Sequence, residues 1–295
     1  MSPQSDVARS EFNHTVEEYY DRTVTLYEEL WGEHVHHGYW DPGASPGAGA
    51  DRHAASERTV YELAAFARVP AGAYILDAGC GIAGPALHLA REYGCRIDGI
   101  TLSSAQVVRG EERVRAAGLA DRIHIRQLDA VNTDYPDDTF DMVWALESLE
   151  HMPDRKAFLA EALRVLRPGG TLAVSAWCIR DSELSAEDDK ILRRIYHHQA
   201  IPSLVSLEEY ERLCWSVGFS DVQVVEWSDA VRNTWDTEFT LVEDLGRDRS
   251  FAMALARSKG VGVLGFFYAI PLMKKAYDRG LMRYGAFRGT KPPPH

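Results

Sequence analysis

The chain has 295 residues, of which 45% are hydrophobic and 26% are charged, and its formal net charge is -12. This is the composition of an ordinary globular protein that buries a core without disulfides. A negative field of this size repels a phosphate backbone unless a basic patch offsets it, and the sequence has no such patch. We therefore expect no nucleic-acid partner.

The cysteines and the apolar segments narrow the protein class further. The four cysteines are scattered without a Cys-x-x-Cys pair, which argues against a zinc or dithiol site, so we expect no metal. Residues 1–15 lack the apolar run of a signal peptide. The longest apolar run, Val261–Met273, is interrupted by glycine and Pro271 and is shorter than the ~20 residues of a membrane span. These features predict a cytoplasmic protein with no membrane span.

The first 70 residues combine an aromatic segment with a helical one. Tyr19–Trp40 is rich in aromatic residues and histidine, and the glycine- and proline-rich stretch Pro42–Gly49 follows it. Ser56–Val69 has apolar residues at helical spacing. We expect residues 1–70 to form an N-terminal helical lid or cap.

Strands and helices then alternate. The sequence predicts strands at Tyr74–Ala78, Arg96–Ile100, Ile123–Leu128, Phe140–Leu146 and Thr171–Trp177, with helices at Pro85–Tyr93, Ala105–Ala117 and Ala157–Val165. Such alternation predicts a parallel sheet with helices on both faces. Residues 71–180 are therefore expected to form an α/β core.

The pattern is less regular after Trp177. Ser185–Gln199 and Ser206–Val217 are predicted to be helical, Val222–Glu226 to be a strand, and Arg232–Tyr284 to be mostly helical and apolar. We expect residues 181–283 to supply cap helices over the carboxyl edge of the sheet, with a core helix and strand near 206–226. The apolar helical region is a candidate surface for a homo-oligomer.

The most informative motif is the glycine-rich stretch Ile75–Gly84. A predicted buried strand leads directly into Gly-x-Gly-x-x-Gly, where glycines allow close backbone approach and the following helix offers free N–H groups. Dinucleotide enzymes carry this motif too. Three other features favour a cofactor other than a dinucleotide: Asp77 before the glycines, Asp129 after the third strand and the Arg167–Thr171 turn.

These motifs carry a resemblance to a known family. Tyr74–Ala176 resembles the core of the class I S-adenosylmethionine (SAM)-dependent methyltransferases, which implies a Rossmann-like seven-stranded sheet with helices on both faces. Its antiparallel last strand would lie at Tyr284–Pro292, with residues 284–295 forming that strand and a tail. Leu30–Trp40 and Glu147–Asp154 resemble the gamma-tocopherol methyltransferases and their small-molecule relatives. The resemblance implies S-adenosyl-L-methionine as cofactor and a small-molecule acceptor.

The resemblance also implies the cofactor-binding residues. Many class I enzymes end the second strand with an acid that binds the ribose, but Thr101 stands there in this chain. We expect the backbone of the next residues and a glutamine to replace that contact. The cofactor-binding residues are then Asp77, Gly79, Cys80, Gly81, Leu102, Ser103, Gln106, Asp129, Ala130 and Leu146.

His151 is the predicted catalytic base, because it follows the fourth strand near the expected position of the methyl group. The alternative is a loop histidine bonded to the backbone. Glu147 and Glu150 flank His151, and one of them could orient it or contact the cofactor, although either could also be a solvated acid. Glu147 is the second predicted catalytic residue. His34, His36 and His37 lack the spacing of a closed metal site. The predicted substrate-binding residues are Tyr19, Tyr20, His37, Tyr39, Trp40 and Trp227.

The aromatic residues of the cap favour a lipophilic natural product of secondary metabolism as acceptor. They would stabilise the cation that forms when an alkene carbon is methylated, so C-methylation of a prenylated or terpenoid-bearing acceptor is favoured. A prenyl-indole alkaloid of the teleocidin kind is one candidate. O- or N-methylation of a phenol, indole or sugar is the alternative. A NAD-dependent oxidoreductase and a SAM-binding regulator are the rival classes, and the chain has no Tyr-x-x-x-Lys pair for the former.

Overall fold

The computed structural model describes residues 3–41, 43, 52–237 and 262–294, and it confirms the α/β fold. Its seven strands form one sheet in the order β3-β2-β1-β4-β5-β7-β6, in which β7 runs antiparallel to both of its neighbours. The strands are β1 (Tyr74–Ala78), β2 (Arg96–Thr101), β3 (Ile123–Gln127), β4 (Phe140–Leu146), β5 (Leu166–Ile179), β6 (Ser220–Glu226) and β7 (Met282–Thr290).

Helices cover both faces of the sheet because the strands are apolar on both sides. Along β1, the side chain of Ile75 belongs to one core cluster and that of Leu76 to the other, as the twofold period of a strand requires. The first cluster includes side chains of α2 (Arg52–Ala67), α3 (Gly84–Tyr93) and α4 (Ser104–Ala116). The second includes side chains of α5 (Arg155–Val165) and α7 (Leu207–Val217).

Capping residues stand before four of the predicted helices, and several strand bounds differ from the prediction. Ser103, Asp154, Ser185 and Ser206 each accept a hydrogen bond from a backbone N–H in the first turn of the helix that follows. β5 begins at Leu166 rather than at Thr171, because Leu166 already pairs with Phe140 before a register shift. β7 begins at Met282, two residues earlier than expected.

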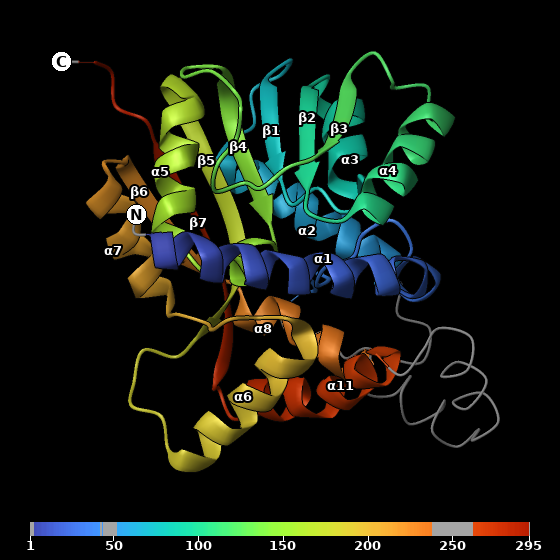
Figure 1. The fold of residues 1–295 in the computed structure, drawn as a ribbon, viewed down its shortest axis with the longest axis vertical. Coiled ribbons are helices and arrows are strands. Elements are labelled where there is room, and N and C mark those ends of the chain that lie inside the picture. The colour runs from blue at the N-terminus through green and yellow to red at the C-terminus, as the bar shows by residue number, and fades with distance from the viewer. Residues whose placement is uncertain (1–2, 42, 44–51, 238–261, 295) are drawn as a thin grey trace.

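A long N-terminal helix lies across the carboxyl ends of the strands (Figure 1). This helix, α1 (Pro3–Trp31), is a single continuous helix, which the sequence did not indicate. It is tied to α4 by charge: Glu28 accepts hydrogen bonds from Arg109 at 2.6 and 2.7 Å and from Arg113 at 3.0 Å. Asp21 accepts a hydrogen bond from the hydroxyl of Ser103 at 2.5 Å. The carboxyl edge of the sheet is thus covered.

Three further helices form a layer beyond α1: α6 (Ala186–Gln199), α8 (Ser228–Val231) and α11 (Gly262–Asp278) (Figure 1). On α11 the side chains of Ala269, Ile270 and Met273 are fully buried, whereas Tyr268 is exposed. Part of the predicted helical region, residues 238–261, and almost all of Pro42–Gly49 lie outside the described residues. A homo-oligomer through this region stays a prediction.

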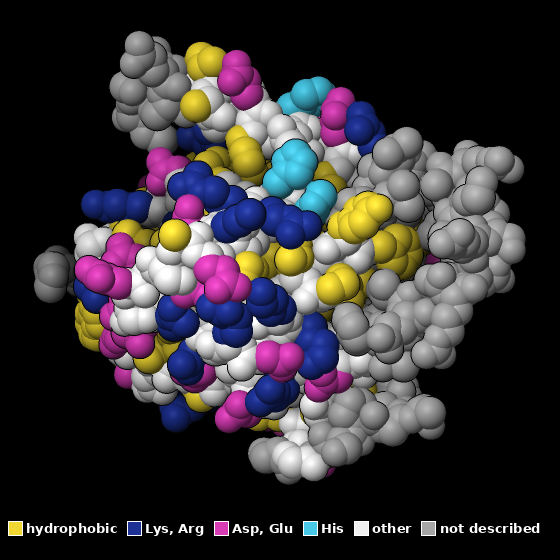
Figure 2. Space-filling view, turned by 90° about the horizontal axis from the view of Figure 1, so that it is seen from below, with side chains coloured by type: hydrophobic (Ala, Val, Ile, Leu, Met, Phe, Trp, Pro, Cys, Tyr) yellow, Lys and Arg dark blue, Asp and Glu magenta, His cyan; other side chains and the backbone are white. Residues whose placement is uncertain are grey.

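The division of the chain into lid, core and cap also stays a prediction. α2, which it places with the lid, buries Val60, Leu63 and Ala64 in the core. None of the helices in the described ranges is long and apolar enough to cross a membrane. Figure 2 shows the face on the α6 and α11 side, where Lys and Arg side chains gather with Asp and Glu side chains between and around them.

Candidate active site

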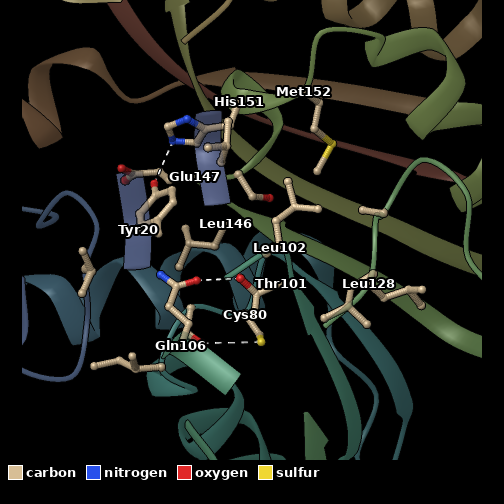
Figure 3. A pocket seen from close by; sticks show the side chains of 18 of the residues that line it. Tyr20, Cys80, Thr101, Leu102, Gln106, Leu128, Leu146, Glu147, His151 and Met152 are labelled. Carbon is tan, nitrogen blue, oxygen red and sulfur yellow. Dashed lines mark hydrogen bonds between the residues drawn. The ribbon is translucent and has the colours of Figure 1, made fainter. Parts of the chain in front are cut away.

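Two cavities meet at the carboxyl ends of β1, β2 and β4, beside the point where the strand order reverses. Open α/β sheets bind ligands at this point. The outer cavity spans about 940 Å³ and the inner cavity about 520 Å³ of empty space, and both volumes include space open to solvent. Five residues line both cavities and so form the wall between them: Tyr20, Val35, His36, Glu147 and His151. Figure 3 shows three of them, Tyr20, Glu147 and His151, close to one another.

The glycine turn after β1 forms the floor of the outer cavity. Gly79 has φ +94°, and a Cβ there would lie 2.2 Å from the Cβ of Ser148, so no side chain fits. Gly81 has φ +53°, and its Cβ would meet only the Nε2 of Gln106, at 4.0 Å. The space at Gly81 is therefore left free for a ligand that approaches the backbone. Cys80, between them, lines the cavity and is buried.

Asp77, at the end of β1, carries a carboxyl oxygen without a partner. The residue is 1% exposed, and its Oδ2 has no hydrogen bond to any described group. Burial raises the pKa of this carboxyl to about 7. Asp77 does not itself line the outer cavity, but it precedes the glycine turn by two residues. A buried carboxyl with a free oxygen fits a ligand that carries a cationic group.

Thr101 stands where many class I enzymes have a ribose-binding acid, and in the structure it contacts Gln106. The Thr101 hydroxyl donates a hydrogen bond to Oε1 of Gln106 at 2.6 Å, which leaves the amide nitrogen of Gln106 beside Gly81 (Figure 3). Leu102 lines the outer cavity, whereas Ser103 does not, because its hydroxyl caps α4 and bonds to α1. Thr101 also lines the outer cavity, and its hydroxyl orients the glutamine.

The outer cavity is also lined by Leu128, Asp129, Ala130 and Leu146. Asp129 accepts a hydrogen bond at Oδ2 from the side-chain amide of Asn13 on α1, at 2.9 Å. Its Oδ1 accepts another from the backbone N–H of Val131, at 2.9 Å. These contacts fix the carboxylate at the cavity wall.

The two ring nitrogens of His151 have different partners, one on the backbone and one on Tyr20. It lies in the 3-10 turn η1 (Leu149–His151), and its Nδ1 is 3.0 Å from the carbonyl oxygen of Ala200. Because a carbonyl only accepts, Nδ1 carries the proton and Nε2 of the neutral ring has a lone pair. Burial lowers the pKa of His151, which favours that neutral form. The hydroxyl of Tyr20 then donates to Nε2 at 2.8 Å (Figure 3).

Glu147 is surrounded by donors. It has φ +50° and accepts hydrogen bonds from the backbone N–H and the Nδ1 of His37, at 2.8 and 2.9 Å. The indole N–H of Trp177 and the hydroxyl of Tyr284 each donate to it at 2.8 Å. Burial opposes ionisation, but the His37 ring and the bonds from His37 and Trp177 outweigh it and lower the pKa of Glu147 to about 2. Its four lone-pair positions are occupied.

The histidine segment after α1 is held inside the protein. His37 accepts at Nε2 from the indole N–H of Trp235, at 2.8 Å. The rings of His34 and His36 approach each other with a nitrogen–nitrogen distance of 3.3 Å. Within the part of the chain that the structure describes, no three His, Cys, Asp or Glu side chains are grouped as a metal site would require.

Comparisons with known proteins agree with this geometry. Residues 76–174 match the family model of a methyltransferase domain. The chain is 34% identical to a probable tocopherol O-methyltransferase of Oryza sativa over 92% of this chain and 76% of the relative. It is 37% identical to the 27-O-demethylrifamycin SV methyltransferase of Amycolatopsis mediterranei over 73% of this chain and 77% of that one. Its structure resembles that of the [4+2]-cyclase SpnF with a TM-score of 0.80 and 27% identity, covering 96% and 97% of the two chains.

The chain belongs to the class I SAM-dependent methyltransferases. It is an enzyme that uses S-adenosyl-L-methionine to methylate small molecules. The outer cavity fits this cofactor, since it combines a bare glycine turn with the carboxylate of Asp129, and the partnerless carboxyl oxygen of Asp77 lies two residues before that turn.

Only two of the six predicted substrate-binding residues of the methyltransferase line a described cavity. Tyr20 and His37 line the inner cavity. Tyr19 lies behind it, where its hydroxyl is 2.6 Å from that of Tyr27. Tyr39, Trp40 and Trp227 line neither cavity, and the ring of Tyr39 packs edge-on against that of Trp227 at 5.5 Å between centroids.

Sequence reasoning did not assign several residues of the inner cavity to the acceptor: Tyr27, Trp31, Glu150, Trp177, Gln199 and Thr234. They come from α1, η1, β5, α6 and the chain beyond α8, which only the fold brings together. Trp31 and Glu150 did have a signal, because they lie in the two motifs that resemble the tocopherol methyltransferases.

Proposed function

We propose that the methyltransferase holds SAM in the outer cavity and a small, largely apolar acceptor in the inner cavity. The observation that carries this proposal is the shared wall, in which Tyr20 and His151 face both cavities. Bound SAM supplies a methyl group on a positively charged sulfur, and the protein must hold the nucleophile in line with it and exclude water. Four aromatic residues of the inner cavity, Tyr27, Trp31, Trp177 and Trp235, suit an apolar acceptor.

The cofactor contacts follow from the geometry of the outer cavity. We assign the amino-acid end of SAM to the Gly79–Gly81 turn and Asp77, whose free carboxyl would face the ammonium group. The ribose is assigned to the amide nitrogen of Gln106 and the backbone of Leu102. The adenine is assigned to Asp129 and Ala130, with Leu146 packing against the cofactor. Ser103 contributes by capping α4.

His151 is proposed as the proton acceptor. A proton on the acceptor would pass to the hydroxyl oxygen of Tyr20 while the proton of Tyr20 passes to Nε2 of His151, so that both residues keep their hydrogen bond. Glu147 would act as a positioning residue, since its four donors leave no lone pair for a proton from the acceptor. It holds His37 and the chain just before η1 against β5.

The acceptor that the cavity suits best is a prenylated or terpenoid-bearing natural product methylated on carbon. Aromatic faces stabilise a carbocation when water is excluded, and the rings of Trp177 and Trp235 lie near one another, 6.0 Å apart. O-methylation of a phenol is the second candidate, favoured by relatives named as a tocopherol O-methyltransferase and a demethylrifamycin methyltransferase.

The test uses SAM labelled with ¹³C on the methyl group and a panel of prenylated indoles and prenylated phenols. We expect S-adenosylhomocysteine (SAH) and labelled product in equal amounts. The carbon shift of the label in the product distinguishes a methyl group on carbon from one on oxygen. If polar acceptors such as sugars are labelled and the whole prenylated panel is not, the proposed acceptor class is wrong.

A further inference from the structure

Glu150 is a buried carboxyl for which the mechanism above has no use. Its side chain is fully buried, and neither carboxyl oxygen has a hydrogen bond of normal geometry to any described group. It lines the inner cavity but not the outer one. An unsatisfied buried carboxyl costs free energy unless a ligand or water meets it. Glu147, three residues earlier, accepts four hydrogen bonds, so the two nearby carboxyls differ sharply in how well their oxygens are satisfied.

A second unsatisfied polar group lines the same cavity. Gln199, at the end of α6, is 3% exposed, and its Oε1 accepts a hydrogen bond from the hydroxyl of Tyr19 at 3.1 Å. Its amide nitrogen has no partner among the described residues. With the Tyr19 hydroxyl donating to the amide oxygen, the amide nitrogen is the end without a partner. Like Glu150, Gln199 does not line the outer cavity.

The surroundings of Glu150 favour the neutral carboxyl. Burial and the negative charge of Glu147 raise the pKa of Glu150 well above its usual range, and they outweigh the backbone N–H groups of Glu150 and Trp177, which lower it. Arg155 is the cation that acts on it, but the guanidinium of Arg155 is already hydrogen-bonded to Ser203 and Tyr210. A neutral carboxyl offers one O–H donor and one carbonyl acceptor.

We propose that Glu150 and Gln199 form an anchor for an uncharged hydroxyl or amide group on an otherwise apolar acceptor. This inference rests on the proposed function, because it takes the inner cavity as the acceptor site. The hydroxyl or amide oxygen of the acceptor accepts from the Gln199 amide, and its O–H or N–H donates to the carbonyl of Glu150. The anchor selects acceptors and sets their orientation, with the opposite end facing Tyr20 and His151.

The first test needs no acceptor. Infrared difference spectra of the SAH-bound wild type and Glu150→Gln are compared at pH 7. We expect a band of a protonated carboxyl in the wild type that Glu150→Gln lacks. If Glu150→Gln instead removes the bands of an ionised carboxylate, the proposal is overturned. SAH affinity measured on both proteins shows that the variant is folded.

The second test compares two acceptors that differ in one group. One is a prenylated aromatic ring with a hydroxymethyl or carboxamide substituent, and the other carries a methyl group in its place. We expect the wild type to prefer the polar member by about 10- to 100-fold in kcat/KM, the scale of a lost buried hydrogen bond. Glu150→Leu and Gln199→Leu should lose most of that preference. Glu150→Gln, which keeps a donor and an acceptor, should retain most of it, and Glu183→Gln on the surface should match the wild type.

The two proposals fail in different ways. Equal preference in the wild type and Glu150→Leu would refute the anchor while leaving methyl transfer intact. A stronger preference for a matching aminomethyl acceptor would refute it too, because a cation would require an ionised Glu150. If the wild type methylates no member of the series, the proposed acceptor class fails, and the infrared spectra still decide the state of Glu150.

Discussion

Replacing His151 by alanine removes the proposed proton acceptor together with two hydrogen bonds. The ring is held by the carbonyl of Ala200 and the hydroxyl of Tyr20, so both groups lose a partner inside the protein. A general base contributes ~10²–10⁴-fold in rate, and we expect kcat to fall by about that factor if the acceptor is a phenol or amine. The unfolding free energy should fall by ~1–3 kcal/mol, the scale of a buried group left unsatisfied. The affinity for SAH should change little.

The pH dependence of the rate distinguishes a catalytic role of His151 from a purely structural one. Because burial lowers the pKa of His151 from 6.5, the ring is neutral above that lowered value, and the rate should rise on an acid limb that lies below pH 6.5. His151→Ala should lack that limb. If the acceptor is an alkene carbon, the base acts only after methyl transfer, so the variant would release SAH but give a changed product mixture.

The assay follows SAH release and product identity together from pH 5 to pH 9. His124→Ala, on the exposed side of β3, is the matched control, and Tyr20→Phe tests the relay by removing only its hydroxyl. A His151→Ala enzyme with the rate, pH dependence and products of the wild type would show that His151 is a structural loop residue. The proton-transfer account would then be wrong.

Four other predictions concern three acidic residues and the glycine turn. Glu147→Gln should lower the unfolding free energy at neutral pH by ~3 kcal/mol, measured by chemical denaturation. Because the pKa of Glu147 is lowered from 4.5 to about 2, the difference in unfolding free energy between wild type and variant should shrink as the pH falls between these values. A difference that stays constant over this range would contradict the prediction. Asp77→Asn should stabilise the cofactor-free protein at pH 7 by ~1–4 kcal/mol, because the raised pKa makes ionisation costly above pH 3.8, and yet it should weaken SAM binding. Gly81→Val should abolish SAH binding in calorimetry while the circular dichroism stays native, and retained affinity would place the cofactor elsewhere. Asp129→Ala should weaken SAH binding by ~1–3 kcal/mol, and a loss confined to acceptor turnover would move the adenine site.

The core of the fold could be predicted because its signals are local. Strand β1, the glycine turn and the caps of α4, α6 and α7 are each specified by residues within about ten positions. The length of α1 could not be predicted. Its stability comes from contacts such as Glu28 with Arg109, which join residues 81 positions apart in the chain.

More of the lining of the outer cavity than of the inner cavity was predicted, for the same reason. Gly79, Gly81, Gln106 and Asp129 follow successive strands whose carboxyl ends meet at one edge. The inner cavity is assembled from distant segments, so Trp31 and Trp177 had no common signal. The role of Glu147 depends on donors from His37 and Tyr284, which no spacing in the sequence reveals.

The central claim is that the acceptor occupies the inner cavity and reacts across the wall of Tyr20 and His151. The most direct measurement is a crystal structure of the full chain with SAH and an acceptor identified by turnover. We predict SAH over the Gly79–Gly81 turn and the acceptor between Trp177, Trp235 and Glu150, with its reacting atom at the shared wall beside Tyr20. An acceptor bound outside the inner cavity, with its reacting atom away from Tyr20 and His151, would contradict the account.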